Sequence, residues 1–234
     1  MRNGMTGATG NIYCGLHEFV DMGFLLHLLR PGDLFVDVGA NVGSYTVLAS
    51  AVCGAEAIAI EPDPGAAAIL RRNVEENKIG DCVEVLEIAS GQAAGVAQLT
   101  IGNDTTNRIT GDISVSTRKV IVKSLDELLV DRVPTLIKVD VEGYEPAVIA
   151  GAKRTLTNPS LKAVIIETVT PEIDASLLDA GFCRGNYDPF MRSLHFSNPD
   201  KFKYHSANTL YVRGREVRDV LLSAPKRNVA GLMV

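Results

Sequence analysis

The stretch that most constrains the fold runs from Leu34 to Ser50, where an apolar segment, a glycine-containing turn and a second apolar segment follow one another. The first segment, Leu34–Val38, predicts a buried strand, and the segment after Gly43 predicts a helix. Glycines let the backbone approach a ligand closely, and a helix N-terminus offers N–H groups without intrahelical partners. Together these features indicate a nucleotide-type cofactor site.

Asp37, which stands just before this turn, limits what the turn can bind. The dinucleotide fingerprint G-x-G-x-x-G places a pyrophosphate at the helix start, whereas this turn reads G-x-x-x-G. Two like charges about 4 Å apart repel by about 4 kcal/mol at an effective dielectric of about 20, which disfavours a phosphate beside Asp37. The α-ammonium of S-adenosylmethionine (SAM) suits the carboxylate better. The alternative is that Asp37 only caps the turn.

Polar residues follow two further predicted strands, Ala57–Ile60 and Cys82–Ile88. In a doubly wound sheet the strand ends line one crevice, so Glu61 is expected to face the same ligand as Asp37. A carboxylate there can accept both hydroxyl protons of a ribose, although NAD enzymes use the same contact. Ser90 and Gln92, after the third strand, are candidates for adenine contacts. Their alternative role is a simple turn.

The fourth core strand, Thr135–Val141, is apolar except for Lys138 and Asp140, which share one face because they are two residues apart. A lysine in a central strand is costly unless it is paired, so a structural Lys138–Asp140 pair is one interpretation. The other is that Asp140, at the strand end, faces the crevice. Glu142 and Glu145 follow in the turn, which places three carboxylates near one strand end.

Three blocks carry a resemblance to a known family: Asp37-Val-Gly-Ala-Asn-Val-Gly, Glu61-Pro-Asp-Pro and Lys138-Val-Asp-Val-Glu-Gly-Tyr-Glu. In order and spacing they closely resemble the FkbM family of SAM-dependent methyltransferases, over about Tyr13 to Arg213. The resemblance implies an α/β fold of the class I, Rossmann-like type. Its sheet would be doubly wound, mostly parallel and seven-stranded, with an antiparallel C-terminal strand pair. It also implies O-methylation of a sugar, polyketide or similar hydroxyl on a small molecule or glycan, with S-adenosylhomocysteine (SAH) as product.

The strand ends and the resemblance together define the candidate site. The residues assigned to the cofactor are Glu18, Asp37, Gly39, Asn41, Gly43, Glu61, Pro62, Ser90, Gln92 and Asp140. Glu142 and Tyr144 are assigned to the substrate. Candidates for the catalytic base that removes a hydroxyl proton, an effect worth about 10²–10⁴-fold, are Asp140, Glu167 and His195. A divalent metal ion held by the same three residues is a less favoured alternative.

Two of these assignments depend on segments without a decisive motif. Glu18 lies on a helix predicted over Leu16–Leu29, and its alternative role is a solvated acid in the first helical turn. The polar segment 102–117 between two predicted strands is a candidate substrate wall, because long loops in compact domains are often functional. The identity of the acceptor cannot be read from it.

Length and charge limit the organisation and the partners. The 234 residues suit one α/β domain, predicted over 16–213 between a flexible arm (1–15) and a tail (214–234). A net charge of −5 without a long basic run argues against nucleic acid or an anionic membrane as partner. Cysteines without C-x-x-C pairing, and the lack of a signal-like or membrane-length apolar run, indicate a cytoplasmic protein. The oligomeric state stays open, with a homodimer as one option.

Two other functions compete with a methyltransferase. An NAD(P)-dependent oxidoreductase shares Glu61 and the doubly wound sheet, but Asp37 and the missing third glycine count against it. A non-catalytic SAM-binding protein would bind the cofactor without transferring its methyl group. The carboxylates around Asp140 argue against that alternative.

Overall fold

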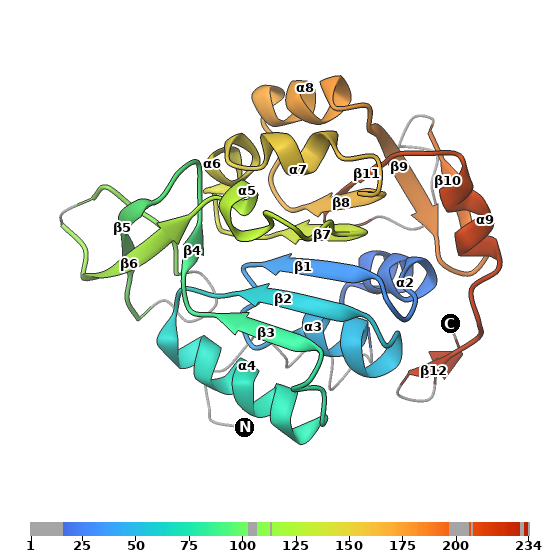
Figure 1. Cartoon of the computed structure of the whole chain (residues 1–234), viewed down its shortest axis with the longest axis horizontal. Helices are drawn as coiled ribbons and strands as arrows, with labels where there is room; N and C mark the ends of the chain where they lie inside the picture. Colours follow the sequence, from blue (N-terminus) through green and yellow to red (C-terminus); the bar gives the residue numbers. More distant parts are fainter. Residues whose placement is uncertain are drawn as a thin grey trace.

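The computed structural model describes residues 16–102, 107–112, 114–196, 206, 208–229 and 232–233. Its main sheet has eight strands in the order β10-β9-β11-β8-β7-β1-β2-β3 (Figure 1). Their bounds are β1 (Leu34–Val38), β2 (Glu56–Ile60), β3 (Val83–Leu86), β7 (Leu136–Val139), β8 (Ala163–Ile166), β9 (Cys183–Asp188), β10 (Ser193–His195) and β11 (Thr209–Val212).

The pairing confirms the fold class expected from the sequence. Strands β3, β2, β1, β7 and β8 pair in parallel, whereas β11 is antiparallel to both β8 and β9. The sheet has eight strands where seven were expected, because β9 and β10 form a hairpin at its edge. The chain moves outward from β1 through β2 and β3, then returns to place β7 on the other side of β1. This reversal is a topological switch point, where open α/β sheets bind their ligands.

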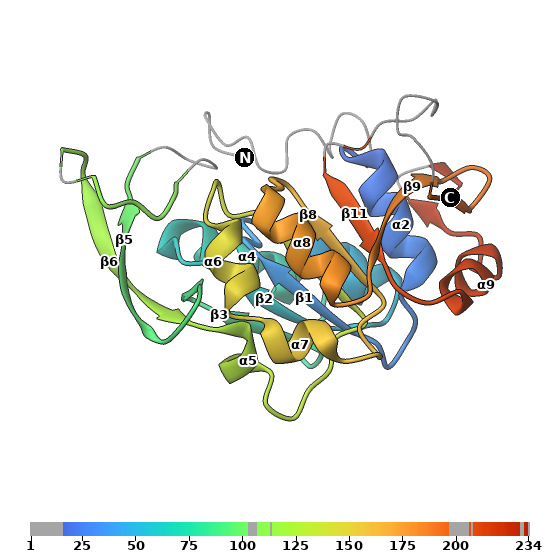
Figure 2. The ribbon, with the colours of Figure 1, turned by 90° about the horizontal axis from the view of Figure 1, so that it is seen from above.

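Helices cover both faces of the sheet (Figure 2). Their bounds are α2 (Phe19–Leu28), α3 (Ser44–Val47), the π-helical segment η1 (Leu48–Val52), α4 (Pro64–Glu76), α5 (Leu125–Leu128), α6 (Glu145–Ala150), α7 (Lys153–Thr157), α8 (Pro171–Asp179) and α9 (Glu216–Leu222). Successive strand residues face opposite layers, because side chains alternate along a strand. Phe35 therefore packs in the core of α2, η1 and α9, while Val36 packs in the core of α5 to α8. None of the helices among the described residues has the length and apolar character needed to cross a membrane.

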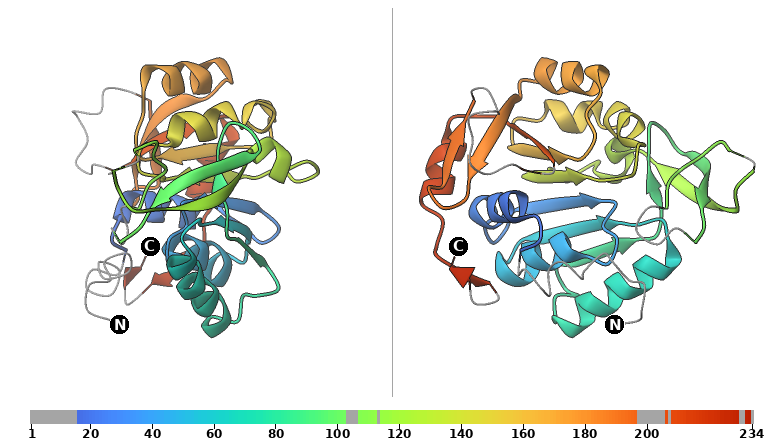
Figure 3. Two further views of the ribbon diagram at one scale, coloured as in Figure 1. Left: turned by 90° about the vertical axis from the view of Figure 1, so that its left-hand side faces the viewer. Right: turned by 180° about the vertical axis from the view of Figure 1, so that it is seen from behind.

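A second, three-stranded sheet projects from the end of the molecule opposite α9 (Figures 1 and 3). Its strands are β4 (Ala89–Ser90), β5 (Gly95–Thr100) and β6 (Thr117–Lys123), in the order β4-β6-β5. The described part of the segment between β5 and β6 folds back along β5. The Thr100 N–H donates to the Arg108 carbonyl at 3.0 Å, and Leu99 forms a β-bridge with Ile109. The described part of the polar insert is therefore held against β5 of the second sheet.

Two helices differ from what the sequence predicts. From Pro146 to Leu156 the sequence predicts one helix, but the structure divides it into α6 and α7. Gly151 between them lies so close to β4 that a Cβ would stand 2.0 Å from the Gly91 carbonyl oxygen. Beyond residue 213, α9 buries Val217 and Leu221 in the core of α2. The predicted arm, residues 1–15, lies outside the described residues, and the domain boundaries stay predictions.

Candidate active site

A cavity of about 380 Å³ opens at the carboxyl ends of β1, β2, β7 and β8, at the switch point of the sheet. Most of the residues predicted from the sequence form its wall, which brings together side chains from α2, the β1 turn and four strand ends. These wall residues are Glu18, Asp37, Gly39, Asn41, Glu61, Pro62, Ser90, Asp140, Glu142, Tyr144 and Glu167. Gly43, Gln92 and His195 lie outside the wall.

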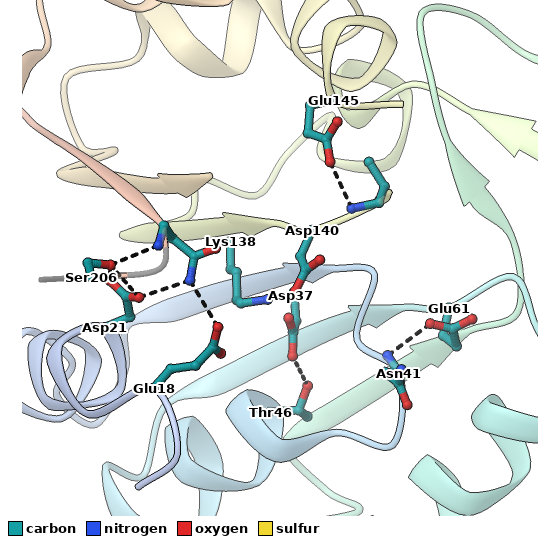
Figure 4. A network of polar contacts seen from close by, with 12 residues as sticks. Glu18, Asp21, Asp37, Asn41, Thr46, Glu61, Lys138, Asp140, Glu145 and Ser206 are labelled. Atoms are coloured by element: carbon teal, nitrogen blue, oxygen red, sulfur yellow. Dashed lines mark hydrogen bonds and ion pairs between the residues drawn. The ribbon is translucent and has the colours of Figure 1, made fainter. Parts of the chain in front are cut away.

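The carboxylate of Glu61 is held on both sides by the backbone at the end of β2. Its Oε2 accepts the N–H of Asn41, and its Oε1 accepts the N–H of Asp63, each at 2.8 Å (Figure 4). Burial raises the pKa of Glu61 to about 7, although the two backbone bonds act in the opposite direction. Each oxygen keeps a second lone pair, so the carboxylate can accept two further hydrogen bonds from the cavity.

The β1 turn brings one side of the cavity against the end of β7. Gly39 has φ +81°, and a Cβ there would lie 1.7 Å from the carbonyl oxygen of Asp140. Its N–H and that of Ala40 both donate to the Ile60 carbonyl, at 2.9 and 3.0 Å. Gly43 meets a different constraint, since a Cβ there would stand 2.3 Å from Leu70 Cδ1. Gly43 therefore packs against α4, which explains its place outside the cavity wall.

Buried charges of both signs meet at the ends of β1 and β7. The Lys138 Nζ lies 2.6 Å from Asp140 Oδ2 and 4.6 Å from the centre of the Tyr45 ring. Burial lowers the pKa of Lys138, but the carboxylates of Asp140 and Asp37 outweigh it, and the net shift is upward. Asp37 is fully buried and accepts the Thr46 hydroxyl at 2.7 Å (Figure 4). The sequence left two interpretations open, a Lys138–Asp140 pair or an Asp140 that faces the cavity, and the structure shows both.

A second group of carboxylates stands at the ends of β7 and β8. One oxygen each from Asp140, Glu142 and Glu167 lies within 4.8 Å of the others. Burial, and then the neighbouring Asp140, raise the pKa of Glu167 to about 8. The pKa of Glu142 is also raised, by burial and by the same neighbour. This end of the cavity therefore holds a proton at neutral pH.

Glu145, the remaining carboxylate of this motif, has a structural position. It is fully buried, and its Oε1 accepts the N–H groups of Val141 and Gly143 at 3.2 and 3.3 Å. These bonds hold a turn in which both Glu142 and Gly143 have positive φ, +53° and +96°. Glu145 thus fixes the backbone that presents Glu142 to the cavity.

The structure separates His195 and Gln92 from the residues with which the sequence grouped them. His195 lies on β10, three strands from β8 in the sheet order, and its Nε2 is 2.8 Å from the Ser193 hydroxyl. His195 therefore does not lie with Asp140 and Glu167, and the structure does not form the base or metal site that the sequence suggested for these three residues. Gln92 is exposed, whereas Ser90 is 2% exposed and its Oγ has no hydrogen-bond partner among the described residues.

Several wall residues carried no signal that could have assigned them from the sequence. Asn107, Arg108 and Ile109 reach the cavity from the polar insert, which was expected to form a wall but contains no motif. Asn107 Nδ2 lies 3.4 Å from Asp63 Oδ2, at the start of α4. Tyr45, which follows the glycine turn, also lines the cavity, although from the sequence its ring would be assigned to the hydrophobic core. Such contacts depend on how the insert folds back.

The comparisons with known proteins identify the family of the chain. The family model described as the methyltransferase FkbM domain matches residues 37–193, which is more than half of the chain. The chain belongs to the FkbM methyltransferase family. The match includes the β1 turn, Glu61 and the acidic strand ends, so the resemblance seen in the sequence is confirmed.

The individual relatives of this FkbM-family chain are distant. It is 33% identical over 110 residues to the 31-O-demethyl-FK506 methyltransferase FkbM of Streptomyces tacrolimicus, covering 46% of this chain and 42% of that protein. It is 33% identical over 87 residues to the ribosomal protein L11 methyltransferase of Chloroflexus aurantiacus, covering 35% and 26%. The matched stretches thus span less than half of either relative. A solved precorrin-6y C5,15-methyltransferase from Geobacter metallireducens is 14% identical, with a TM-score of 0.48, covering 90% and 92%.

SAM is the cofactor of this FkbM-family protein, and the residues present fit it. Glu61 has free acceptor positions for the two ribose hydroxyls, and the buried Ser90 Oγ is an unused polar group in the same wall. The carboxylates of Glu18 and Asp37 suit a cationic methionine end better than an anionic one. A SAM molecule with its adenosine toward β2 and β4 and its methionine end toward α2 would use all three features.

Proposed function

We propose that this FkbM-family protein is a SAM-dependent O-methyltransferase that acts on a hydroxyl group of a small molecule or glycan. The observation that carries the proposal is the single cavity in which the backbone-held Glu61 and the Asp140–Glu142–Glu167 carboxylates stand at different strand ends. The first group suits binding and the second suits proton transfer. When bound, SAM supplies an electrophilic methyl group on a sulfonium for an acceptor oxygen.

The residues of the chain would contribute first by position. Glu61, Asn41 and Ser90 would hold the adenosine end, while Asp37 and Glu18 would face the ammonium. Holding two reactants in the productive geometry can supply roughly 7–11 kcal/mol of the barrier. The acceptor would lie over Glu142 and Tyr144, which stand beside Asp140 in the wall.

The acceptor hydroxyl must also lose its proton, and Asp140 is the residue that would take it. Glu167 keeps its own proton below about pH 8, because burial and the charge of Asp140 raise its pKa. Asp140 is paired with the buried ammonium of Lys138 at 2.6 Å, which stabilises its negative charge. Asp140 is therefore the residue proposed to take the proton of the acceptor hydroxyl, while Glu167 keeps its own.

Oxygen as the acceptor atom is supported by the Streptomyces relative, whose name describes a 31-O-demethyl substrate. The Chloroflexus relative is named for a ribosomal protein, so the acceptor class must be tested rather than transferred. We propose that the protein has no nucleic-acid or membrane partner, on the acidic net charge of −5, and that it is cytoplasmic, on cysteines without C-x-x-C pairing. A homodimer is the oligomeric state to test by light scattering.

The test has two stages. Calorimetric titration with SAH, SAM and NADH is expected to give micromolar binding of the first two and none of the third. SAH release is then measured with hydroxyl-bearing sugars and polyketides and with matched amine-bearing compounds. Transfer to hydroxyl acceptors supports the proposal. Binding of NADH alone would overturn it, and transfer only to amines would overturn the choice of oxygen.

A further inference from the structure

Two carboxylates stand one helical turn apart at the start of α2, with one inside the cavity wall and one behind it. Glu18 precedes the helix and lines the cavity, whereas Asp21, 2% exposed, is enclosed by protein (Figure 4). Residues at this spacing are neighbours on a helix surface, where like charges destabilise one another. Some other group must therefore hold the pair together.

That group is Asn208, which comes directly before β11 and is nearly as buried as Asp21. Its Nδ2 donates to Glu18 Oε1 at 3.2 Å and to Asp21 Oδ2 at 2.9 Å. An amide nitrogen carries two hydrogens, so this one group uses both to bridge the two carboxylates. Because Asn208 and α2 are far apart in sequence, the bridge ties the C-terminal strands to the cavity wall.

Ser206 completes the arrangement by bonding to Asp21. Its Oγ lies 2.5 and 2.6 Å from the two oxygens of Asp21, and it accepts the backbone N–H of Asn208 at 2.9 Å. Ser206 therefore fixes Asp21, whereas the structure gives Asn208 a direct hydrogen bond to Glu18. The two residues offer a matched pair for separating cavity positioning from ordinary stability.

We propose that Asn208 is a positioning residue for the cofactor: by bonding Glu18 to Asp21 it holds the Glu18 carboxylate in the cavity wall, facing the cationic methionine end. This inference rests on the proposed function, since it takes SAM or SAH as the ligand. Without the amide, Glu18 regains side-chain freedom and is repelled by Asp21. The cost of ordering it again is then taken from the binding free energy.

The test is a set of calorimetric SAH titrations at pH 7.5 on the full chain. Asn208→Ala and Glu18→Ala are each expected to weaken SAH binding by about tenfold, which is about 1.4 kcal/mol. The double variant is expected to bind no more weakly than Glu18→Ala, because Asn208 acts through Glu18. Ser206→Ala removes the bonds to Asp21 and to the Asn208 backbone N–H but keeps the Asn208 side-chain amide that bonds Glu18, and it is expected to stay within about twofold. Thermal unfolding of each variant reports its stability separately.

Additive losses in the double variant would overturn the proposal, and so would a loss in Ser206→Ala as large as that in Asn208→Ala. Either result would mean that Asn208 acts on the fold and not on Glu18. If Asn208→Ala does not fold, Asn208→Ser is used, since one hydroxyl proton can serve one carboxylate and an intermediate loss is expected. Absence of SAH binding by the unaltered protein would instead overturn the proposed function.

Discussion

Glu61 and Glu167 both follow a parallel strand of the same sheet and both line the same cavity, yet their surroundings differ. Glu61 is buried and accepts one backbone N–H on each oxygen at 2.8 Å. Glu167 is more exposed than Glu61, although still partly enclosed, and lies beside Asp140 and Glu142. The first carboxylate is fixed by the backbone, and the second is surrounded by other carboxylates.

The difference follows from what lies next to each strand end. The β1 turn lies beside β2 and supplies N–H donors to Glu61, which fix its geometry for a ligand. The ends of β7 and β8 place acids side by side, so that burial and the neighbouring charge raise the pKa of Glu167 to about 8. This contrast supports the proposed division of the site, with one region for binding and the other for proton transfer.

The largest effect that separates the two regions is expected from Asp140→Asn. The amide keeps the size of the side chain but cannot take a proton, so kcat is expected to fall by about 10²–10⁴-fold. SAH affinity is expected to stay within about threefold, because Glu61 and the β1 turn are unchanged. Initial rates of SAH release, with the best acceptor of the panel, and calorimetry measure the two quantities.

Glu142→Gln is the matched control for Asp140→Asn, since it removes a charge from the same cluster without removing the proposed base. Its kcat is expected to fall by less than about tenfold. Full turnover in Asp140→Asn would exclude Asp140 as the base and would leave Glu167 as the candidate. A large loss of SAH affinity in Asp140→Asn would show that the two regions are not separable.

The next effect is expected where the two regions touch, at Gly39. Gly39→Ala places a Cβ 1.7 Å from the Asp140 carbonyl oxygen in a backbone with φ +81°, so the turn must move. We expect a loss of about 3 kcal/mol in the free energy of unfolding, with SAH affinity and turnover reduced together. Urea unfolding measures the first quantity.

Gly32→Ala gives the control for backbone strain alone. Gly32 has φ +89°, but a Cβ there meets nothing within 4 Å. Its expected cost is about 1 kcal/mol, with no change in SAH binding. Equal losses in the two alanine variants would mean that the close approach to Asp140 contributes nothing.

The positions of the strand ends could be predicted from the sequence, because apolar runs and their spacing determine which residues follow a strand. In a doubly wound sheet those residues meet at one edge, and Asp37, Glu61, Asp140 and Glu167 do line one cavity. The Lys138–Asp140 pair followed from the alternation of side chains along β7. These predictions needed only local periodicity and a general rule of topology.

Contacts between segments far apart in sequence could not be predicted in this way. His195 lies at the outer edge of the sheet because β10 forms a hairpin with β9, and the sequence alone does not give the place of that hairpin. Gly43 leaves room for the Leu70 side chain of α4, and Asn208, before β11, donates a hydrogen bond to Asp21 of α2. The close approach of Gly151 to Gly91 is another contact between segments far apart in sequence, and it lies where the predicted helix is divided.

A smaller effect is expected from Glu61→Gln, at the binding end of the comparison. The pKa of Glu61 is about 7, so the free protein loses the charged acceptor as pH falls below 7. SAH affinity is therefore expected to decrease from pH 8 to pH 6. Glu61→Gln is expected to bind about tenfold more weakly at pH 8 and to show no such pH dependence. Calorimetry at three pH values tests this, and unchanged affinity in the variant would contradict the ribose assignment.

The smallest effect is expected from Asp63→Asn, which changes the charge beside Glu61 without removing the helix cap. Asp63 Oδ1 accepts the N–H groups of Gly65 and Ala66 at 2.8 and 3.0 Å, and asparagine caps a helix about as well as aspartate. The negative charge of Asp63 helps to raise the pKa of Glu61, after burial. Its removal should lower that pKa and move the midpoint of the pH-dependent SAH affinity to lower pH. If the midpoint does not move and the free energy of unfolding is unchanged, burial alone determines the pKa of Glu61. Charged neighbours would then shift a carboxylate pKa only at the other end of the cavity, where Asp140 lies beside Glu167.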